Sequence, residues 1–179
     1  LTGYRKMAQR IVNLVAKQLS AESGQSFGPC TTKQIHLTSP PFQGAKAVQK
    51  YVANLEKELE GQGLAAYYAW YLTTVYGPQS QMILNKMTEF SADTPTIALA
   101  RAEVWFTAQY EMVNSASDFF VRRTGRLYFD IESIAEIRGA VMEDLQEYLD
   151  WDDARMKQEN EGLDLLLYDA THYYDEELT

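Results

Sequence analysis

The 179-residue sequence predicts an all-α fold of five or more packed helices. Apolar residues recur at the spacing of one helical face in almost every segment outside residues 23–44. Glycine, proline and capping residues stand at the ends of these segments, where helices begin and end. No segment shows the alternation of apolar and polar residues that is typical of a half-buried strand. These three observations favour helices packed on helices.

The first predicted helix covers residues 4–19, with Thr2 placed to cap it and Gly3 at its opening. Its apolar positions are Tyr4, Met7, Ala8, Ile11, Leu14, Val15 and Leu19. Residues 23–44 are rich in Gly, Pro, Ser and Thr, which is typical of loops. Because a structureless connection of about 20 residues is unusual inside one domain, we expect a boundary here. The expected organisation is a helix in residues 1–20, a linker in 21–44 and a helical domain in 45–179.

Four helices are expected in the first part of that helical domain. They cover residues 45–60, 64–76, 79–90 and about 96–113. Gly61 and Gly63, Gly77-Pro78, and the segment 91–95 separate them. A short helix is then expected from Ser117 or Asp118 to Arg123.

Two longer helices are expected at the carboxyl end. Asp130 is the expected N-cap of the first, and Asp152 or Asp153 begins the second. The inward positions of the first are Ile131, Ile134, Ala135, Ile137, Arg138, Val141, Met142, Leu145, Tyr148 and Leu149. Those of the second are Met156, Leu163, Leu166, Leu167 and Ala170.

The charge is acidic overall and unevenly distributed. Sixteen Lys and Arg face 25 Asp and Glu, which gives a net charge of −9. Residues 1–90 carry net +4 and residues 91–179 carry net −13. Because nucleic acid and anionic membranes repel an acidic surface, this balance excludes nucleic acid as the main partner and disfavours a charged membrane.

The remaining composition indicates a reducing, cytoplasmic setting. The one cysteine, Cys30, has no partner for an internal disulfide, and no N-x-S/T glycosylation site occurs. No apolar run is long enough to span a membrane, and the first residues do not show the basic-then-apolar pattern expected of a leader. The sequence begins with Leu1 rather than Met, which indicates a piece of a longer protein.

Two segments resemble ligand-binding loops without meeting their requirements. GQGLAA, residues 61–66, fits G-x-G-x-x-A, but a charged helix precedes it where a dinucleotide site needs a strand. We interpret it as a turn between helices. The acidic run from Asp150 to Glu161 has Arg155 where a calcium loop needs glycine. We interpret that run as a solvated helix start.

Metal and nucleophile chemistry find no support in the sequence. The only histidines are His36, in the loop, and His172, three residues after Asp169. A di-metal site in a helical bundle needs two Glu-x-x-His motifs and further carboxylates. Cys30 has no histidine nearby in sequence to activate it. The residues therefore predict no metal ligand and no catalytic residue in this chain.

Aromatic and basic clusters are the remaining candidates. Tyr67, Tyr68, Trp70, Tyr71 and Tyr76 lie on one short helix, and core packing is favoured over a ligand groove or interface. They cannot all face one core, so some should meet another surface. Arg122, Arg123 and Arg126 can bind a phosphate, but ion pairs with Glu111, Asp118 and Asp130 are favoured.

Three segments together resemble a known family. LTGYRKMAQRIV at residues 1–12 resembles the segment after a Gly-Gly-Lys turn in FAD-dependent glycerol-3-phosphate dehydrogenases and α-glycerophosphate oxidases. YLTTVYGPQSQMIL at 71–84 resembles that family's Tyr-Leu…Tyr-Gly helix pair. ARAEVWFTAQYEMVNSASDFFVRRTGRLYFD at 100–130 is similar to its Ala-Glu…Glu-Met…Asp-x-x-x-x-Arg-Arg-Thr-x-x-Leu region.

The resemblance implies that the chemistry lies outside this chain. Family members have an N-terminal FAD domain followed by a C-terminal helical cap domain, so residues 1–20 are similar to the last helix of the FAD domain and residues 45–179 to the cap. The implied reaction oxidises sn-glycerol 3-phosphate to dihydroxyacetone phosphate, with hydride passing to the flavin and electrons then to oxygen or a quinone. This fragment is then structural, inactive and without bound FAD.

The implied contacts to the cofactor are Leu1 and Thr2. They map onto the turn beside the flavin, where free N–H groups and the positive end of a helix stabilise anionic reduced flavin. The implied partners are the FAD domain of the same chain, glycerol 3-phosphate, and a membrane surface only if a quinone accepts the electrons. A homo-oligomer is left open. From the residues alone, the alternative is a free-standing acidic helical module for protein interaction.

Overall fold

The fold is all-α in a computed structural model that describes residues 3–35 and 41–172. Eight α-helices and no strand occur in these residues, so the predicted fold class is confirmed. The chain divides into two units, Leu1–Pro41 and Phe42–Thr179. Within residues 3–35 and 41–172 no helix is both long enough and apolar enough to cross a membrane.

Unit 1 contributes one long helix, α1 (Tyr4–Ser23), and a single 3₁₀ turn at Thr32–Gln34. The helix ends where Gly24 takes a left-handed conformation, with φ of 70°, and donates its N–H to the carbonyl of Ser20. The predicted cap Thr2 lies outside the described residues. No residue of α1 is buried, so its large apolar side chains stay mostly exposed within this unit.

Unit 2 carries the remaining helices, and most of the predicted ones are confirmed. They are α2 (Ala45–Gly61), α3 (Tyr67–Tyr76), α4 (Ser80–Met87), α5 (Pro95–Tyr110), α6 (Arg126–Phe129), α7 (Ile131–Leu149) and α8 (Asp153–Thr171). Short 3₁₀ turns at Gly77–Gln79 and Thr88–Phe90 flank α4. The segment η4 (Asp118–Arg123), expected as a short helix, is a π-helical turn, and the single-turn α6 was not predicted.

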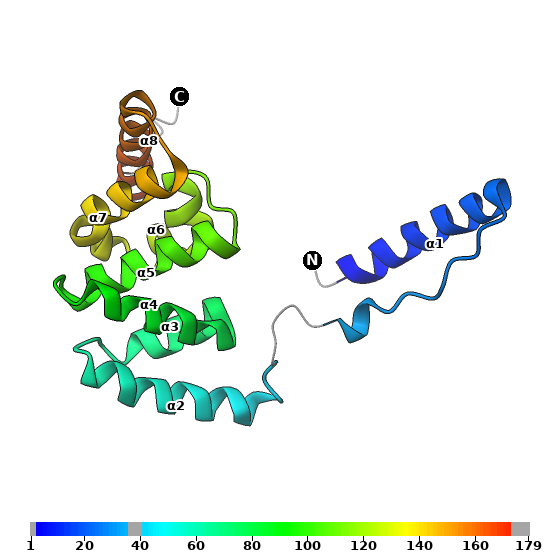
Figure 1. Ribbon diagram of the computed structural model, residues 1–179, viewed down its shortest axis with the longest axis horizontal. Coiled ribbons are helices and arrows are strands. Elements are labelled where there is room, and N and C mark those ends of the chain that lie inside the picture. The colour runs from blue at the N-terminus through cyan, green and yellow to red at the C-terminus, as the bar shows by residue number, and fades with distance from the viewer. Residues whose placement is uncertain (1–2, 36–40, 173–179) are drawn as a thin grey trace, which may run out of the picture. The chain divides into compact units, whose positions relative to one another are not determined.

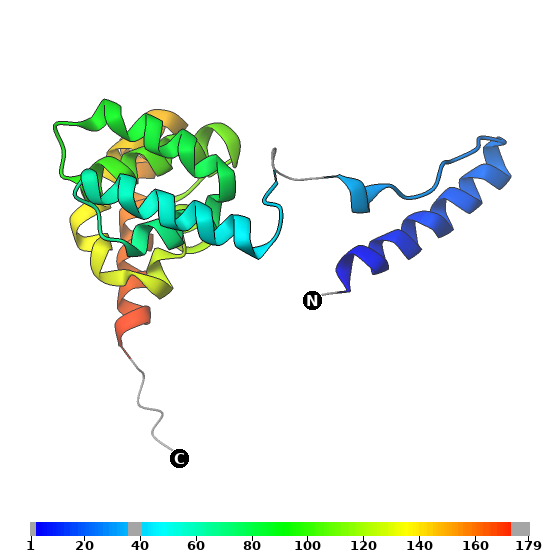
Figure 2. The ribbon, with the colours of Figure 1, turned by 90° about the horizontal axis from the view of Figure 1, so that it is seen from below.

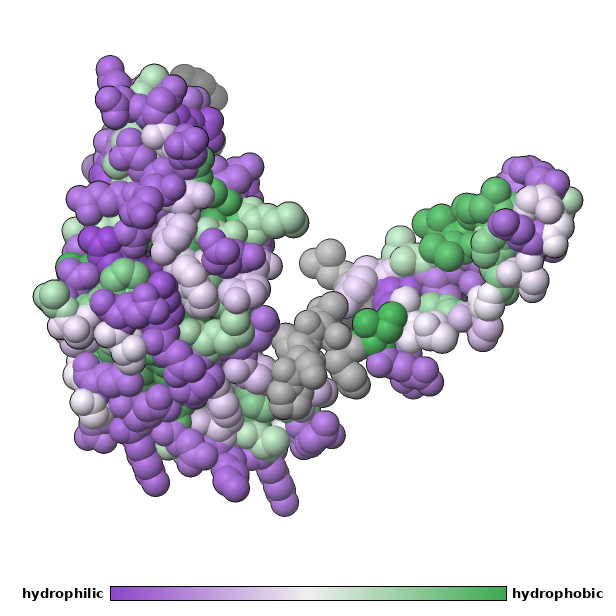
Figure 3. All heavy atoms as spheres, viewed as in Figure 1, coloured by the Kyte–Doolittle hydropathy of each residue, from purple (hydrophilic) through white to green (hydrophobic). Residues whose placement is uncertain are grey.

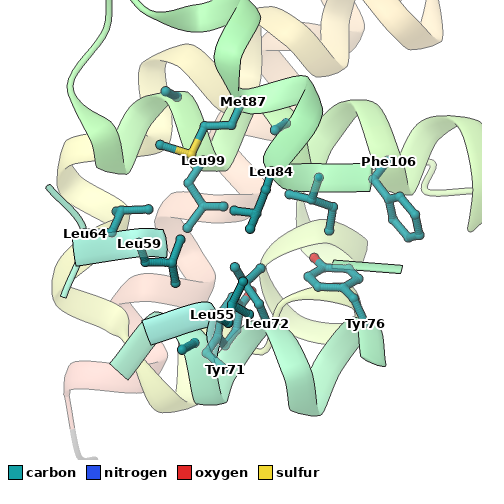
Figure 4. Packing of buried hydrophobic residues seen from close by; sticks show 14 residues of the cluster. Leu55, Leu59, Leu64, Tyr71, Leu72, Tyr76, Leu84, Met87, Leu99 and Phe106 are labelled. Carbon is teal, nitrogen blue, oxygen red and sulfur yellow. The ribbon is translucent and has the colours of Figure 1, made fainter. Parts of the chain in front are cut away.

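The helices of unit 2 pack in sequence order. Contacts join α2 to α3, α4 to α5, and α5 to α7, so that α5 lies between α4 and α7 (Figure 1). Seen from below, α2 runs across the body of this unit (Figure 2). One core cluster fills the space between α2, α3, α4 and α5. Figure 4 shows Leu55, Leu59, Leu72, Leu84 and Leu99 pointing toward one another in it.

A second core cluster joins α5, η4, α7 and α8. Phe119 and Phe120 of the π-helical turn are fully buried in it, beside Ile137 and Leu145 of α7. The helix α8 adds Leu163 as its one buried residue and covers the cluster's edge with half-buried side chains. The prediction that Ala135 and Ala170 face inward is wrong, because both residues are exposed. Each is a short side chain beside the apolar face of its helix.

Candidate functional site

The glycine-rich segment at residues 61–66 is a turn between helices, as predicted. Helix α2 ends there, and the N–H of Leu64 reaches back to the carbonyl of Leu59. Gly63 has a φ of 78°, which explains the glycine, because that conformation strains other residues. No strand precedes the turn in the described residues, so it does not form a dinucleotide-binding loop.

The acidic run after residue 150 begins a helix. The carboxylate of Asp152 accepts the N–H of Arg155 at 2.7 Å and caps α8. Asp150 takes the left-handed conformation at the end of α7, with φ of 52°. Within residues 3–35 and 41–172, no three His, Cys, Asp or Glu side chains gather as a metal site would require.

The described nucleophile and histidine candidates belong to different units, Cys30 to unit 1 and His172 to unit 2. Cys30 is exposed in unit 1, and its contact with Thr32 lowers the pKa of the thiol. His172 stacks on Tyr168 at the end of α8, with ring centroids 4.0 Å apart. His36 lies outside the described residues.

The most strongly organised polar cluster of unit 2 surrounds Glu103. This residue of α5 is fully buried, and its Oε1 accepts the hydroxyls of Tyr71 at 2.6 Å and Tyr76 at 3.0 Å. Its Oε2 accepts Nη2 of Arg126 at 2.6 Å. Burying a carboxylate costs free energy unless it is paired with a cation and hydrogen-bonded. Glu103 is paired with Arg126 and accepts hydrogen bonds from both tyrosines. We call Glu103, Arg126, Tyr71 and Tyr76 the buried cluster.

The environment of the buried cluster fixes its protonation. Burial, followed by the charge of Glu103, raises the pKa of both Tyr71 and Tyr76 well above the ordinary value. Burial acts to lower the pKa of Arg126, because it disfavours the charged form. The neighbouring Glu103 carboxylate raises that pKa through its charge and its hydrogen bond, and the pKa of Arg126 lies above its ordinary value. The two phenols therefore remain protonated donors at neutral pH and cannot serve as bases.

Arg126 links the buried cluster to α7. Its Nη1 donates to Asp130 at 3.2 Å and to Ser133 at 3.1 Å, and its guanidinium lies over the ring of Tyr71. The predicted pair of Arg126 with Asp130 is thus confirmed. Glu103 was missed, because a single acidic residue on an otherwise apolar helix gives no sequence signal for its partners. Asp130 precedes α7 as predicted, but its side chain pairs with Arg126 instead of capping the helix.

The other two arginines of the predicted cluster pair with Asp118. Arg123 approaches its carboxylate at 3.4 Å, and Arg122 stands 3.8 Å away with an exposed side chain. The ion-pair interpretation is therefore confirmed for Asp118. Burial raises the pKa of the Glu111 carboxyl. The charge of Arg123 lowers the same pKa by less, so the pKa of Glu111 lies above its ordinary value.

A groove of about 770 Å³ runs along the surface beside the buried cluster. One wall is the stripe of α3 that carries Tyr67, Trp70 and Val75, and the other includes η4 and α6. Tyr71 and Tyr76 are buried, whereas Tyr67 and Trp70 are exposed, so the aromatic helix serves both a core and a surface, as expected. We call this feature the α3–α6 groove.

The groove offers binding surface without catalytic groups. The Tyr71 hydroxyl, the Glu103 carboxylate and both terminal nitrogens of Arg126 are engaged in hydrogen bonds within the protein, and only the buried Nε of Arg126 lacks a partner among the described residues. The described residues contain neither a strand nor a phosphate-binding turn, so they do not fit the dinucleotide part of FAD. The predicted flavin contacts Leu1 and Thr2 lie outside the described residues.

Comparison with known proteins places the chain in a family. Residues 30–156 match the family described as the C-terminal domain of alpha-glycerophosphate oxidase. The chain belongs to this family. That stretch contains all of α2 to α7 and the first residues of α8. The match therefore includes the first core cluster, the buried cluster, the α3–α6 groove and the second core cluster apart from its α8 residues Leu163, Leu166 and Leu167, but not α1.

Individual relatives agree with this assignment. The chain is 35% identical over 175 residues to the aerobic glycerol-3-phosphate dehydrogenase of Bacillus subtilis (strain 168) and 31% identical over 173 residues to that of Staphylococcus aureus (strain USA300). It also resembles the X-ray structure of the glycerol-3-phosphate dehydrogenase from Bacillus halodurans complexed with FAD. The TM-score is 0.77 at 29% identity, over 98% of this chain and 36% of that one.

The relatives are much longer than this chain. The alignments cover 95% and 96% of the chain but only 31% of the length of either relative. The chain thus spans about a third of the curated relatives that it matches, and the matched third includes the family's C-terminal domain.

Proposed function

We propose that this chain is the C-terminal helical part of an FAD-dependent enzyme that oxidises sn-glycerol 3-phosphate to dihydroxyacetone phosphate. In this proposal the FAD and the reacting groups belong to an N-terminal domain, and the 179 residues supply structure without activity. The family match over residues 30–156 carries the proposal. The absence of a nucleotide-binding turn in the described residues is compatible with it.

The proposal gives the two parts of the chain different roles. Residues 1–20 are the last helix of the FAD domain, residues 21–44 are the linker, and residues 45–179 are the helical domain. The exposed apolar side chains of α1 support this division, because such a helix is stable in water only with something to cover its face. The proposed setting is cytoplasmic, with a membrane surface approached only if a quinone accepts the electrons.

The proposed contacts to FAD are made by Leu1 and Thr2. In the sequence they precede Gly3, the N-cap of α1, and the first turn of this helix has backbone N–H groups without partners inside the helix. Such a terminus favours an anion, and reduced flavin is one. An intact-enzyme structure with Thr2 far from the flavin ring would contradict this assignment.

The test uses the complete gene product. Its sequence before Leu1 should contain a Gly-Gly-Lys turn and, some hundreds of residues earlier, a G-x-G-x-x-G turn between a strand and a helix. The purified product should be yellow, and anaerobic sn-glycerol 3-phosphate should bleach its flavin absorbance. Re-oxidation by air with release of hydrogen peroxide identifies an oxidase, and re-oxidation by a quinone identifies a dehydrogenase.

Two results would contradict the proposal. One is a complete product that purifies without flavin and cannot be reconstituted with FAD. The other is a flavoprotein whose absorbance does not respond to sn-glycerol 3-phosphate but does respond to another 2-hydroxy compound. The 179-residue chain serves as control, since it should be colourless.

A further inference from the structure

The α3–α6 groove has the composition of a protein interface. Its walls expose Tyr67, Trp70 and Phe129, and Arg122 stands at its rim with 66% of its side chain exposed. Tryptophan, tyrosine and arginine are the residues enriched where protein interfaces bind most strongly. Trp70 is 57% exposed in the same groove as exposed Tyr67 and Phe129, and exposed apolar side chains that gather in one patch are typical of interaction sites.

The exposed side chains of the groove are held in place. Phe129 is 82% exposed, yet its ring lies 3.2 Å from the point where a Cβ of Gly125 would stand. Gly125 has a φ of 66°, so this approach depends on a glycine at the start of α6. On the other wall, the ring of Tyr67 lies 6.3 Å from that of Trp70 and 6.2 Å from that of Tyr71. A surface whose anchors are already positioned binds with less loss of entropy.

A small molecule fits the groove less well than a protein does. Small-molecule sites enclose most of the ligand and direct a few polar groups at it. Here the Tyr71 hydroxyl and Nη2 of Arg126 are occupied by Glu103, and Nη1 of Arg126 by Asp130 and Ser133, which leaves the buried Nε of Arg126 as the one guanidinium nitrogen without a partner among the described residues. Of the three arginines that line the groove, Arg122 is the most exposed, and its ion pair to Asp118 is 3.8 Å long.

The way the chain enters unit 2 indicates which protein can reach the groove. Phe42, at the start of the unit, packs on Tyr51, with ring centroids 5.1 Å apart. It also lies 3.9 Å from the Cβ position of Gly77, which directly follows α3. A ten-residue helix is about 15 Å long. The attachment point of a domain before Phe42 therefore lies within about 15 Å, the length of α3, of the groove. Such a domain meets the groove at a high effective concentration.

We propose that the α3–α6 groove is the docking surface for the FAD domain of the same polypeptide. This inference rests on the proposed function and adds the residues that make the contact. Trp70 and Phe129 bury their rings against that domain, and Arg122 pairs with a carboxylate on it.

The test places the photo-crosslinker p-benzoylphenylalanine at position 70 of the complete gene product. Position 168 provides the control, because Tyr168 is also an exposed aromatic residue but lies on α8, outside the groove. We expect an intramolecular crosslink from position 70 to peptides that precede residue 1, and none from position 168. Crosslinks between two copies, or none from position 70, would overturn the docking.

A pair of variants gives an independent readout. Trp70→Ala and Arg122→Glu, combined in the complete product, should speed proteolysis of the 21–44 linker at least fivefold, whereas Tyr168→Ala should not. Both groove side chains are largely exposed, so the variants should leave the thermal unfolding of the 179-residue chain unchanged. Equal proteolysis rates in all variants would contradict the docking.

Flavin content and substrate bleaching, measured on the same preparations, separate this inference from the proposed function. A product that bleaches with sn-glycerol 3-phosphate but gives no crosslink loses only the docking. A product that crosslinks as expected but holds no flavin keeps the docking surface and loses the function. A gene product with no domain before residue 1 would overturn both.

Discussion

The helices α1 and α5 are both long and rich in apolar residues, but they differ in what covers them. In α5 eight residues are buried, among them Leu99 and Phe106. In α1 none is buried, and Met7, Ile11 and Leu14 are exposed. Figure 3 shows the difference on the face in view, where green apolar side chains gather along α1 and purple side chains dominate unit 2.

This contrast indicates that unit 2 carries its own core and that unit 1 does not. The two core clusters contain every buried hydrophobic residue of the described chain, and all of them lie in unit 2. Burial of apolar surface is the main favourable term in folding. We therefore expect unit 2 to account for the stability of the 179-residue chain, and α1 to gain its stability from another domain.

The largest expected effect comes from breaking the buried cluster inside unit 2. Glu103→Ala leaves Arg126 charged, buried and without its main partner, and removes the acceptor of two tyrosine hydroxyls. We expect the free energy of unfolding to fall by about 3–5 kcal/mol, because removing one member of a buried ion pair strands the other. Urea denaturation followed by tryptophan fluorescence measures this.

The matched control for that variant is Asp164→Ala. Asp164 pairs with Arg138 at the surface, where its side chain is 62% exposed. Exposed pairs contribute less than about 1 kcal/mol. A similar loss for both variants would show that the buried cluster does not hold unit 2 together.

The second prediction compares the two helices directly. Leu99→Ala removes a fully buried side chain from α5, and Leu14→Ala removes one that is 68% exposed on α1. We expect a loss of about 2–5 kcal/mol for the first, because it leaves a cavity. The second should stay within about 0.5 kcal/mol. Thermal unfolding of both 179-residue variants checks this, and equal effects would contradict the contrast between the units.

The third prediction concerns the contact of α5 with α7. Arg101 of α5 pairs with Asp144 of α7 and also with Asp93 and Glu143. Burial raises the pKa of Asp144 to about 6, although Arg101 lowers it in part. The folded state therefore holds this proton more tightly than the unfolded chain, where an Asp has a pKa of about 3.9.

The sign of the pH effect follows from that pKa. A group whose pKa is raised in the folded state stabilises the folded protein at low pH. This contribution to the free energy of unfolding is lost as the pH rises from about 4 through 6. Asp144→Asn removes the titration. We expect the stability of the variant relative to the original to rise by about 1–3 kcal/mol over this range, since one pKa unit corresponds to about 1.4 kcal/mol. Urea denaturation at pH 4, 5, 6 and 7 measures it, and a constant difference would contradict it.

The sequence predicted the helices well because each carries its own periodic signal. Asp152 marks the start of α8 because its side chain caps the helix, which depends only on neighbouring residues. The apolar face of α2 likewise follows from the spacing of its own residues. The π-helical form of η4 and the single turn of α6 were not predictable, because packing of Phe119 and Phe120 decides them.

The candidate site was predictable only in part. The sequence identified Arg126 and Tyr71 but not their convergence on Glu103, which lies 23 and 32 residues away along the chain. The sequence suggested that some of the aromatic residues on α3 face outward. On the opposite wall it identified Arg122, Arg123 and Arg126 but not Phe129, because Phe129 belongs to a helix that was not predicted.

Hydrogen exchange of α1 tests most directly whether it belongs to another domain. Amide exchange would be followed by mass spectrometry in the 179-residue chain and in the complete gene product. In the 179-residue chain, we expect the amides of Tyr4–Ser23 to exchange fast and those of α5 to be protected. In the complete product, α1 should become protected while α5 stays as it was. Protection of α1 that is equal in the two proteins would contradict the account.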